Sequence, residues 1–326
     1  MAEFISGLNP LLAVFLIAAL GYLIGGIKIA GIELGTAGVL IVALVFGHFG
    51  SVMPALVRNL GLALFVTSVG FIAGPKFFRN FKQNARNYIL LGFLIILVGA
   101  VSTWAIIKIA GIEPELAAGL MTGALTTTPG LSAAMDAAGN LKDLVTVGYA
   151  IAYPFGVVGV VLFVQLMPKI LRVDMKKELE SFRAANPTEV KPIRGKLKLL
   201  DREGFFSFAL VVVLGILLGS VTIPLGGGAE FSLGTTGGPL VAALVIGHFG
   251  HIGPIDLRVR KPALETFREL GLMLFLIGAG TEGGKSFVSK LQEEGAMLFV
   301  YGAIITILPM IVGYFLAAKS LKLSLL

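Results

Sequence analysis

Long apolar runs separated by short polar stretches are the dominant pattern of this chain. Several of them approach the roughly 20 residues that an α-helix needs to cross a bilayer. In chain order the runs occupy residues 10–30, 35–50, 60–74, 88–110, 115–139, 144–167, 205–225, 236–250, 264–281 and 295–318. The pattern predicts an all-α, polytopic integral membrane protein.

Composition agrees with this class. Of the 326 residues, 56% are hydrophobic and 14% are charged, whereas soluble domains average about 25% charged residues. The chain has no cysteine, which excludes disulfides and thiolate metal sites. Its net charge of +7 comes largely from basic residues in short stretches beside the apolar runs. That arrangement is typical of cytoplasmic loops near anionic lipid and not of a nucleic-acid-binding surface.

The fifth apolar run is interrupted by the sequence Thr126-Thr-Thr-Pro129. A proline cannot continue a helix, but it suits the first position of a new one, here with Thr128 as the N-cap. We therefore expect two half-helices, 115–125 and 129–139, that meet at this turn. At membrane depth a broken backbone persists only where protein buries it or where it lines a water-filled cavity. The break is thus a candidate substrate site, the alternative being a proline kink satisfied by neighbouring helices.

The second half-helix is expected to direct its N-terminal amides and positive dipole end toward the membrane interior. Transporters built from inverted repeats hold anionic substrate groups in this way. The three threonine hydroxyls add donors, unless they bond only to their own helix. This chemistry favours a substrate that carries a carboxylate.

Two tyrosines follow the broken run, one helical turn apart and directly before a proline. They are expected either to line the same cavity or to belong to the interfacial aromatic belt. The candidate substrate-binding residues are Thr126, Thr127, Thr128, Pro129, Gly130, Ser132, Tyr149, Tyr153 and Pro154.

Other ionisable residues in the apolar regions have two interpretations each. Asp136 either binds a coupling cation or lies at the headgroup boundary. His48 and His248 are either proton sites or helix-end caps, and Glu282 is interpreted as a surface residue. No acidic cluster or His-x-x-x-His pair accompanies them, so no metal and no cofactor is expected. The motifs of serine hydrolases, zinc proteases and P-loop enzymes do not occur in the sequence, which argues against an enzyme.

The two halves of the chain are related in sequence. Gly47-His-Phe-Gly50 recurs as Gly247-His-Phe-Gly250. Further on, Leu60-Gly-Leu-Ala-Leu-Phe65 is echoed by Leu270-Gly-Leu-Met-Leu-Phe275. These matches predict an internal repeat, with an N-terminal membrane repeat at 1–167, a linker at 168–203 and a C-terminal membrane repeat at 204–326.

Charges between the runs predict the orientation of the repeats. The loop expected at 75–87 contains lysines and arginines and no acid, so it is expected in the cytoplasm, whereas the counterpart loop expected at 282–294 has no basic excess. This difference predicts inverted topology. The linker 168–203 is also basic and is expected on the same side as 75–87. Three apolar runs separate the two, so this requires the broken hairpin 115–139 to be re-entrant. The N-terminus is then expected outside. A second broken hairpin is expected beyond Leu326, so we expect the native chain to continue.

The broken segment Gly123–Ala134, the segment Tyr149–Gly156 and the duplicated Gly-His-Phe-Gly motif together resemble the aspartate–alanine exchanger family. The resemblance covers both membrane halves. It implies a homodimeric secondary transporter of the bacterial inner membrane that exchanges amino-acid or dicarboxylate anions, with Thr126 to Pro129 in the substrate site. Many members carry a pair of soluble regulatory domains between the halves, where this chain has only the linker.

The residues leave two other functions open, a cation–proton antiporter that uses Asp136 and a passive anion channel. The expected partners are a small carboxylate or amino-acid substrate and membrane lipid, and no nucleic acid is expected.

Overall fold

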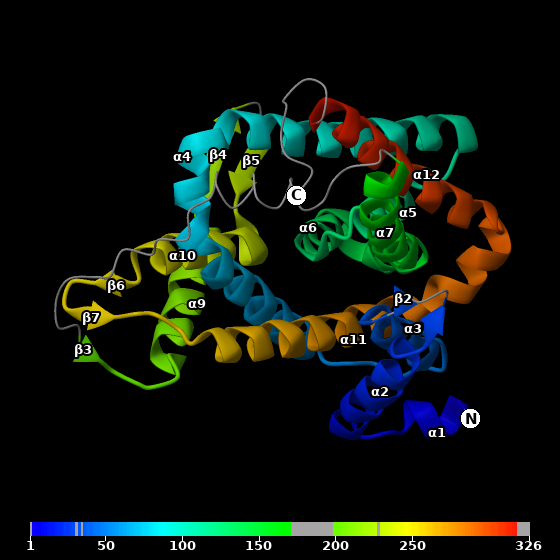
Figure 1. Cartoon of the computed structure of the whole chain (residues 1–326). Helices are drawn as coiled ribbons and strands as arrows, with labels where there is room; N and C mark the ends of the chain where they lie inside the picture. Colours follow the sequence, from blue (N-terminus) through cyan, green and yellow to red (C-terminus); the bar gives the residue numbers. More distant parts are fainter. Residues whose placement is uncertain (1, 30–31, 34, 171–197, 227–228, 318–326) are drawn as a thin grey trace. The chain divides into compact units, whose positions relative to one another are not determined.

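The computed structural model describes residues 2–29, 32–33, 35–170, 198–226 and 229–317 (Figure 1). Its helices are α1 (Ala2–Ser6), α2 (Pro10–Gly25), α3 (Ala37–His48), α4 (Ala55–Ala110), α5 (Pro114–Ala124), α6 (Thr128–Ala138), the 3-10 turn η1 (Gly139–Leu141), α7 (Lys142–Ile170), α9 (Phe205–Gly219), α10 (Gly234–Phe249), α11 (Lys261–Glu294) and α12 (Met297–Phe315). The all-α, polytopic class predicted from the apolar pattern is confirmed.

The strands are short and form three small sheets among the described residues. Two are antiparallel pairs, β1 (Lys28–Ile29) with β2 (Ile32–Glu33) and β4 (Thr222–Gly226) with β5 (Ala229–Ser232). The third has the order β3 (Lys198–Leu199), β7 (Ile255–Asp256), β6 (His251–Ile252). β3 lies near the end of the linker predicted at 168–203, and residues 171–197 of that linker lie outside the described part of the chain.

The stretch 75–87 is not the loop that its charges suggested, because α4 continues through it as a helix from Ala55 to Ala110. After Pro75 this stretch has no glycine or further proline, and charged residues by themselves do not end a helix. At 1.5 Å per residue the 56 residues of α4 would extend about 84 Å, far more than one bilayer. Its parts long and apolar enough to cross a membrane are Ala55–Pro75 and Arg86–Ala110.

The counterpart stretch 282–294 is also helical, and α11 runs without a break to Glu294. Gly295, at a φ of +68°, follows the helix end and separates it from α12. Among the described residues, α12 is the third segment long and apolar enough to span a membrane. The prediction of loops was therefore wrong at equivalent places in both halves.

The chain divides into two compact units that do not coincide with the two sequence repeats. One unit comprises Met1–Val52, Asn84–Lys191 and Ala279–Leu326, and the other comprises Met53–Gln83 and Pro192–Gly278. Each unit thus takes elements from both repeats. The core of the first contains Leu116, Leu120, Ile151, Leu298 and Ile305, all buried. The core of the second contains Phe71, Phe208, Val211, Ala243 and Leu257.

Helices α4 and α11 cross at glycines that occupy equivalent places in the repeated motif. A Cβ on Gly61 would lie 2.3 Å from the backbone nitrogen of Phe275, and a Cβ on Gly271 would lie 2.5 Å from that of Phe65. Each glycine meets the phenylalanine of the other motif, which is the reciprocal pattern of a local two-fold contact. The glycines let the two backbones touch.

The helix that carries each Gly-His-Phe-Gly motif packs against the following helix of the other repeat. In one unit, a Cβ on Gly284 of α11 would lie 2.3 Å from the carbonyl oxygen of Leu44 in α3. In the other unit, a Cβ on Gly74 of α4 would lie 2.7 Å from the carbonyl oxygen of Leu244 in α10. Leu44 and Leu244 are equivalent residues of the repeat. This exchange of partners explains why the compact units interleave the two halves.

A polar tether fixes the loop before α5 to the end of α11. Glu113 and Lys290 form an ion pair, and Lys290 also lies 2.7 Å from Glu293. The hydrogen bond from the Lys290 ammonium lowers the pKa of the Glu113 carboxyl from its ordinary value. The same pairing raises the pKa of Lys290.

The crossing predicts opposite effects at two glycines of α4. Gly61→Ala places a methyl group against backbone that has no room to yield, and overpacking of this kind costs about 1–3 kcal/mol. Gly92→Ala meets no atom within 4 Å and is expected to stabilise the helix by about 0.5–1 kcal/mol. Thermal unfolding of the purified protein in detergent should show a lower midpoint for the first variant and a higher one for the second. Equal responses would contradict the crossing.

The tether predicts a pH-dependent loss of stability in Glu113→Gln. Since the pKa of Glu113 is lowered in the folded state, its contribution is present above the ordinary pKa of 4.5 and disappears as the pH falls through the lowered value. The midpoint of unfolding should therefore be lower than wild type at pH 7, with the two converging below pH 4.5. Glu269→Gln is the control, because that carboxylate is 68% exposed and 3.9 Å from Arg268. A difference that persists at low pH would show that packing, not charge, is lost.

Candidate functional site

The broken run folds as a helical hairpin, with α5 ending at Ala124 and α6 beginning at Thr128. Thr126 lies between them at a φ of +51°, and it is the one described non-glycine residue with a positive φ. A β-branched residue is disfavoured in this region. The predicted half-helices are confirmed with a boundary shift of about one residue at each end.

The N-cap of α6 is Thr127, whose side chain accepts a hydrogen bond of 3.1 Å from the Gly130 amide. The prediction that Thr128 caps the helix was wrong by one residue. Thr128 takes the first helical position and Pro129 the second, where the missing proline N–H also costs nothing.

Most amides at the hairpin tip already have partners. The amide of Thr126 donates to the Gly123 carbonyl, that of Thr127 to Thr122, and that of Leu131 to Thr127, each at 2.9 Å. Since the Thr127 hydroxyl takes the Gly130 amide, the donors that the sequence suggested for an anion are largely used. Within the described residues, the Thr128 amide is the tip donor to which no hydrogen bond is assigned.

Glycines hold the hairpin tightly against α7, and α5, α6 and α7 lie side by side, drawn in green (Figure 1). A Cβ on Gly119 would lie 2.0 Å from the Val145 carbonyl oxygen, and one on Gly123 would lie 2.5 Å from that of Tyr149. Gly156 of α7 has the same relation to the tip, since its Cβ would lie 2.7 Å from the Cγ2 of Thr126. The position of the break is thus fixed by backbone contact.

The two tyrosines of α7 lie beside the tip. Tyr149 is fully buried, and its hydroxyl lies 3.5 Å from the Thr128 hydroxyl. The ring of Tyr149 stacks on that of Tyr153, with centroids 5.0 Å apart and 23° between the planes. The Tyr153 hydroxyl lies 3.4 Å from the hydroxyl of Thr36, at the start of α3. No pattern in the sequence indicated that Thr36 joins this group.

A groove of about 690 Å³ reaches the tip from the side of α4. Its walls are mainly apolar and include Ile96, Trp104, Met121 and Leu125, and it reaches α6 at Thr127 and Gly130. The threonines Thr103 and Thr122 also line it, but their hydroxyls donate to carbonyls of their own helices. The groove therefore suits an aliphatic group, and polar recognition is confined to the tip.

The remaining predicted residues lie at different distances from the tip. Ser132 is buried in the next turn of α6, whereas Asp136 is exposed, two turns beyond Pro129. Pro154 lies within α7, and its side chain is outside what the structure describes. The fold brings together Thr126 to Gly130 with Tyr149 and Tyr153 and leaves Asp136 apart from them.

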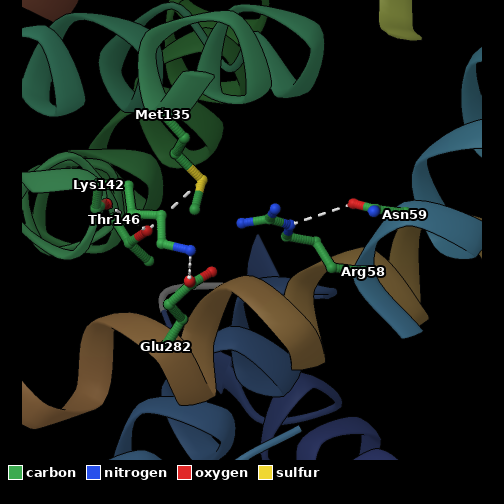
Figure 2. A network of polar contacts seen from close by, with 6 residues as sticks. All are labelled: Arg58, Asn59, Met135, Lys142, Thr146 and Glu282. Carbon is green, nitrogen blue, oxygen red and sulfur yellow. Dashed lines mark hydrogen bonds and ion pairs between the residues drawn. The ribbon is translucent and has the colours of Figure 1, made fainter. Parts of the chain in front are cut away.

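A polar network lies at the base of the hairpin (Figure 2). The Lys142 ammonium lies 2.5 Å from Glu282, and the Thr146 hydroxyl contacts both the Lys142 carbonyl and the sulfur of Met135. Glu282, interpreted from the sequence as a surface residue, is 27% exposed and pairs with Lys142. This pair was missed because Lys142 and Glu282 lie in different repeats. Among the described residues no group of three or more metal-ligating side chains occurs.

Comparison with known proteins identifies related chains. The family Asp-Al_Ex, described as a predicted permease membrane region, matches residues 13–169 and 207–326. An uncharacterized transporter of Bacteroides fragilis is 29% identical over 468 aligned positions, which cover 96% of this chain and 88% of that protein. One of Bacteroides thetaiotaomicron is 28% identical with the same coverage. One of Symbiobacterium thermophilum is 40% identical over 183 residues, 54% of this chain and 34% of that protein.

The alignments of 468 positions exceed the 326 residues of this chain, so the two Bacteroides relatives carry additional residues within the matched range. No solved structure matches the chain significantly.

The left-handed conformation of Thr126 predicts that Thr126→Gly stabilises the protein. Strain of this kind costs about 1–3 kcal/mol, and part of the relief is offset by the greater freedom of glycine in the unfolded chain. A net gain of about 1 kcal/mol should raise the thermal unfolding midpoint in detergent. Thr126→Val, which keeps the branched side chain, should give no gain. A loss of stability in the glycine variant would show that the side chain contributes more than its strain costs.

Proposed function

Because the chain belongs to the Asp-Al_Ex family of predicted permease membrane regions, we propose that it exchanges amino-acid or dicarboxylate anions across the bacterial inner membrane by alternating access. Membrane transport itself follows from the family and from the transporters that match the chain. It is a membrane transporter and not an enzyme.

The observation that carries the proposal is the broken hairpin, held in place by the glycines of α5 and α7. Discontinuous helices in transporters place a half-helix N-terminus at the anionic group of the substrate. In this site the substrate carboxylate binds the Thr128 amide and the hydroxyls of Thr126 and Thr128. Thr127 keeps the start of α6 formed through its bond to Gly130.

The shape of the surroundings favours a small substrate. Tyr149 and Tyr153 close the site on the α7 side, and both are buried. On the α4 side, the apolar groove takes the short aliphatic part of the substrate. A compact amino acid or dicarboxylate combines these two chemistries, whereas a bare inorganic ion would leave the groove unused.

The orientation and assembly are further parts of the proposal. The basic stretch that α4 carries between its two apolar segments and the basic linker 168–203 support a cytoplasmic location for both and an external N-terminus. The reciprocal contacts of α4 and α11 support repeats related by a two-fold axis, and the charge difference supports their inverted topology. We also propose a homodimer, as in the family that the sequence resembles.

The proposal is tested by counterflow in proteoliposomes. Vesicles loaded in turn with aspartate, alanine, succinate or glutamate are challenged with the labelled compound, and uptake is expected only when an internal partner is present. Collapse of a sodium or proton gradient without carboxylate movement would favour a cation–proton antiporter instead. Uptake without an internal partner and without saturation would indicate a channel. Dependence of the exchange on sodium or pH, lost in Asp136→Asn, would assign the coupling ion to Asp136.

Two tip variants should abolish exchange in a folded protein. Pro129→Ala removes the proline that keeps a helix from continuing through the break. Thr127→Val removes the hydroxyl that caps α6, at a cost in stability of about 1 kcal/mol. Thr306→Val is the matched control, because that buried hydroxyl donates to the Gly302 carbonyl of its own helix. Size-exclusion profiles should match wild type for all three. Wild-type exchange by the double tip variant would place the substrate elsewhere.

A further inference from the structure

Thr36 is the N-cap residue of α3, yet its hydroxyl does not cap that helix. Threonine at this position usually accepts a bond from an amide of the first turn. Here the hydroxyl lies instead 3.4 Å from the hydroxyl of Tyr153. The Thr36 hydroxyl thus contacts a residue 117 positions away and not the first turn of its own helix. This indicates a role beyond starting the helix.

The place of Thr36 is fixed by backbone packing of α2 on α3. A Cβ on Gly25 would lie 2.1 Å from the carbonyl oxygen of Gly35, and one on Gly38 would lie 2.3 Å from that of Gly21. Gly35 has a φ of +55°, which a residue with a side chain rarely adopts. Thr36 therefore sits on a rigid support next to the tyrosine pair.

From Thr36 the contacts continue to the hairpin tip. Tyr153 stacks on Tyr149, and Tyr149 reaches the Thr128 hydroxyl at 3.5 Å. Both hydroxyl–hydroxyl distances exceed the about 2.7–2.8 Å that is usual for such bonds. Each contact is therefore longer than usual, and a small movement of either tyrosine would shorten or break it.

The second repeat supplies a natural comparison. The sequence Leu34-Gly35-Thr36, upstream of the first Gly-His-Phe-Gly motif, recurs as Leu233-Gly234-Thr235 upstream of the second. Thr235 lies in the first turn of α10 and is exposed, whereas Thr36 is half-buried. The same residue in the same motif thus faces the tyrosines in one repeat and the surroundings of the protein in the other.

We propose that Thr36 is a positioning residue for the substrate site. It holds the Tyr153 hydroxyl, the Tyr153 ring holds Tyr149, and Tyr149 holds the Thr128 hydroxyl that faces the carboxylate. Thr36 does not itself touch the substrate. This inference rests on the proposed function of the hairpin tip.

The same contacts link the tip to the second repeat. α3 packs on α11, where a Cβ on Gly47 would lie 2.2 Å from the Thr281 carbonyl oxygen and one on Gly280 would lie 2.6 Å from the Cβ of Ala43. A displacement of α11 along α3 thus reaches the substrate site through Thr36 and the two tyrosines. Substrate affinity then depends on a residue outside the hairpin.

The test is carboxylate counterflow by the full-length chain with Thr36→Val, Thr36→Ser and Thr235→Val. Valine matches threonine in shape and lacks the hydroxyl, so Thr36→Val should raise KM about three- to ten-fold, as expected for one lost hydrogen bond, with Vmax little changed. Thr36→Ser keeps the hydroxyl and should retain a KM within two-fold of wild type. Thr235→Val should match wild type. In a Tyr153→Phe background, Thr36→Val should add no further change, because the two act through one contact.

Three results would overturn the inference. These are an unchanged KM in Thr36→Val, an equal rise in Thr36→Ser, and additive effects with Tyr153→Phe. If wild type exchanges carboxylates and Pro129→Ala does not, any of these overturns the role of Thr36 alone. If wild type exchanges no carboxylate, the proposed function fails and this inference fails with it.

Discussion

Backbone contact between helices is the constraint on which this structure depends. In a bilayer the hydrophobic effect does not drive helices together, because lipid tails are as apolar as the side chains, so association relies on close packing. Here glycines let α5 lie against α7, α2 against α3, and α4 against α11, with separations that no side chain would permit. The 43 glycines of the chain include the residues at each of these contacts. Their cost in helix propensity, about 1 kcal/mol each, is offset by van der Waals contact along whole helix faces.

The broken hairpin follows from that packing. α5 is fixed to α7 up to Gly123, and Gly156 leaves space for Thr126 beyond the helix end. The chain then turns at Thr126, which has a left-handed backbone conformation, and a new helix begins at Thr128. The turn satisfies most of its own amides. At the proposed substrate site an anion would therefore meet few free backbone donors, and its binding would rest on hydroxyls and on the dipole of a short helix.

The exchange of partners between the repeats has a mechanical consequence. Each Gly-His-Phe-Gly helix packs on a helix from the other half of the chain, so neither repeat has a complete packing surface of its own. The ion pair of Lys142 and Glu282 adds a polar link of the same type, joining the base of the hairpin to α11 (Figure 2). Motion in one repeat therefore changes contacts in the other, as alternating access by the proposed mechanism requires.

The sequence by itself determined the membrane class, the apolar segments, the internal repeat and the break at Thr126–Pro129. These depend on local composition, on self-similarity and on the inability of proline to continue a helix. Only the tertiary structure decided that α4 and α11 continue as helices through their charged stretches. Charge does not end a helix, and the helices that pack against α4 and α11 come from the other half of the chain. The tertiary structure also decided that Thr127 is the cap, that the tip amides are mostly occupied, and that Thr36 and Glu282 reach residues more than a hundred positions away. Such pairings depend on which helix faces meet at the glycines, and hydrophobic periodicity carries no information about that choice in segments that are apolar on every side.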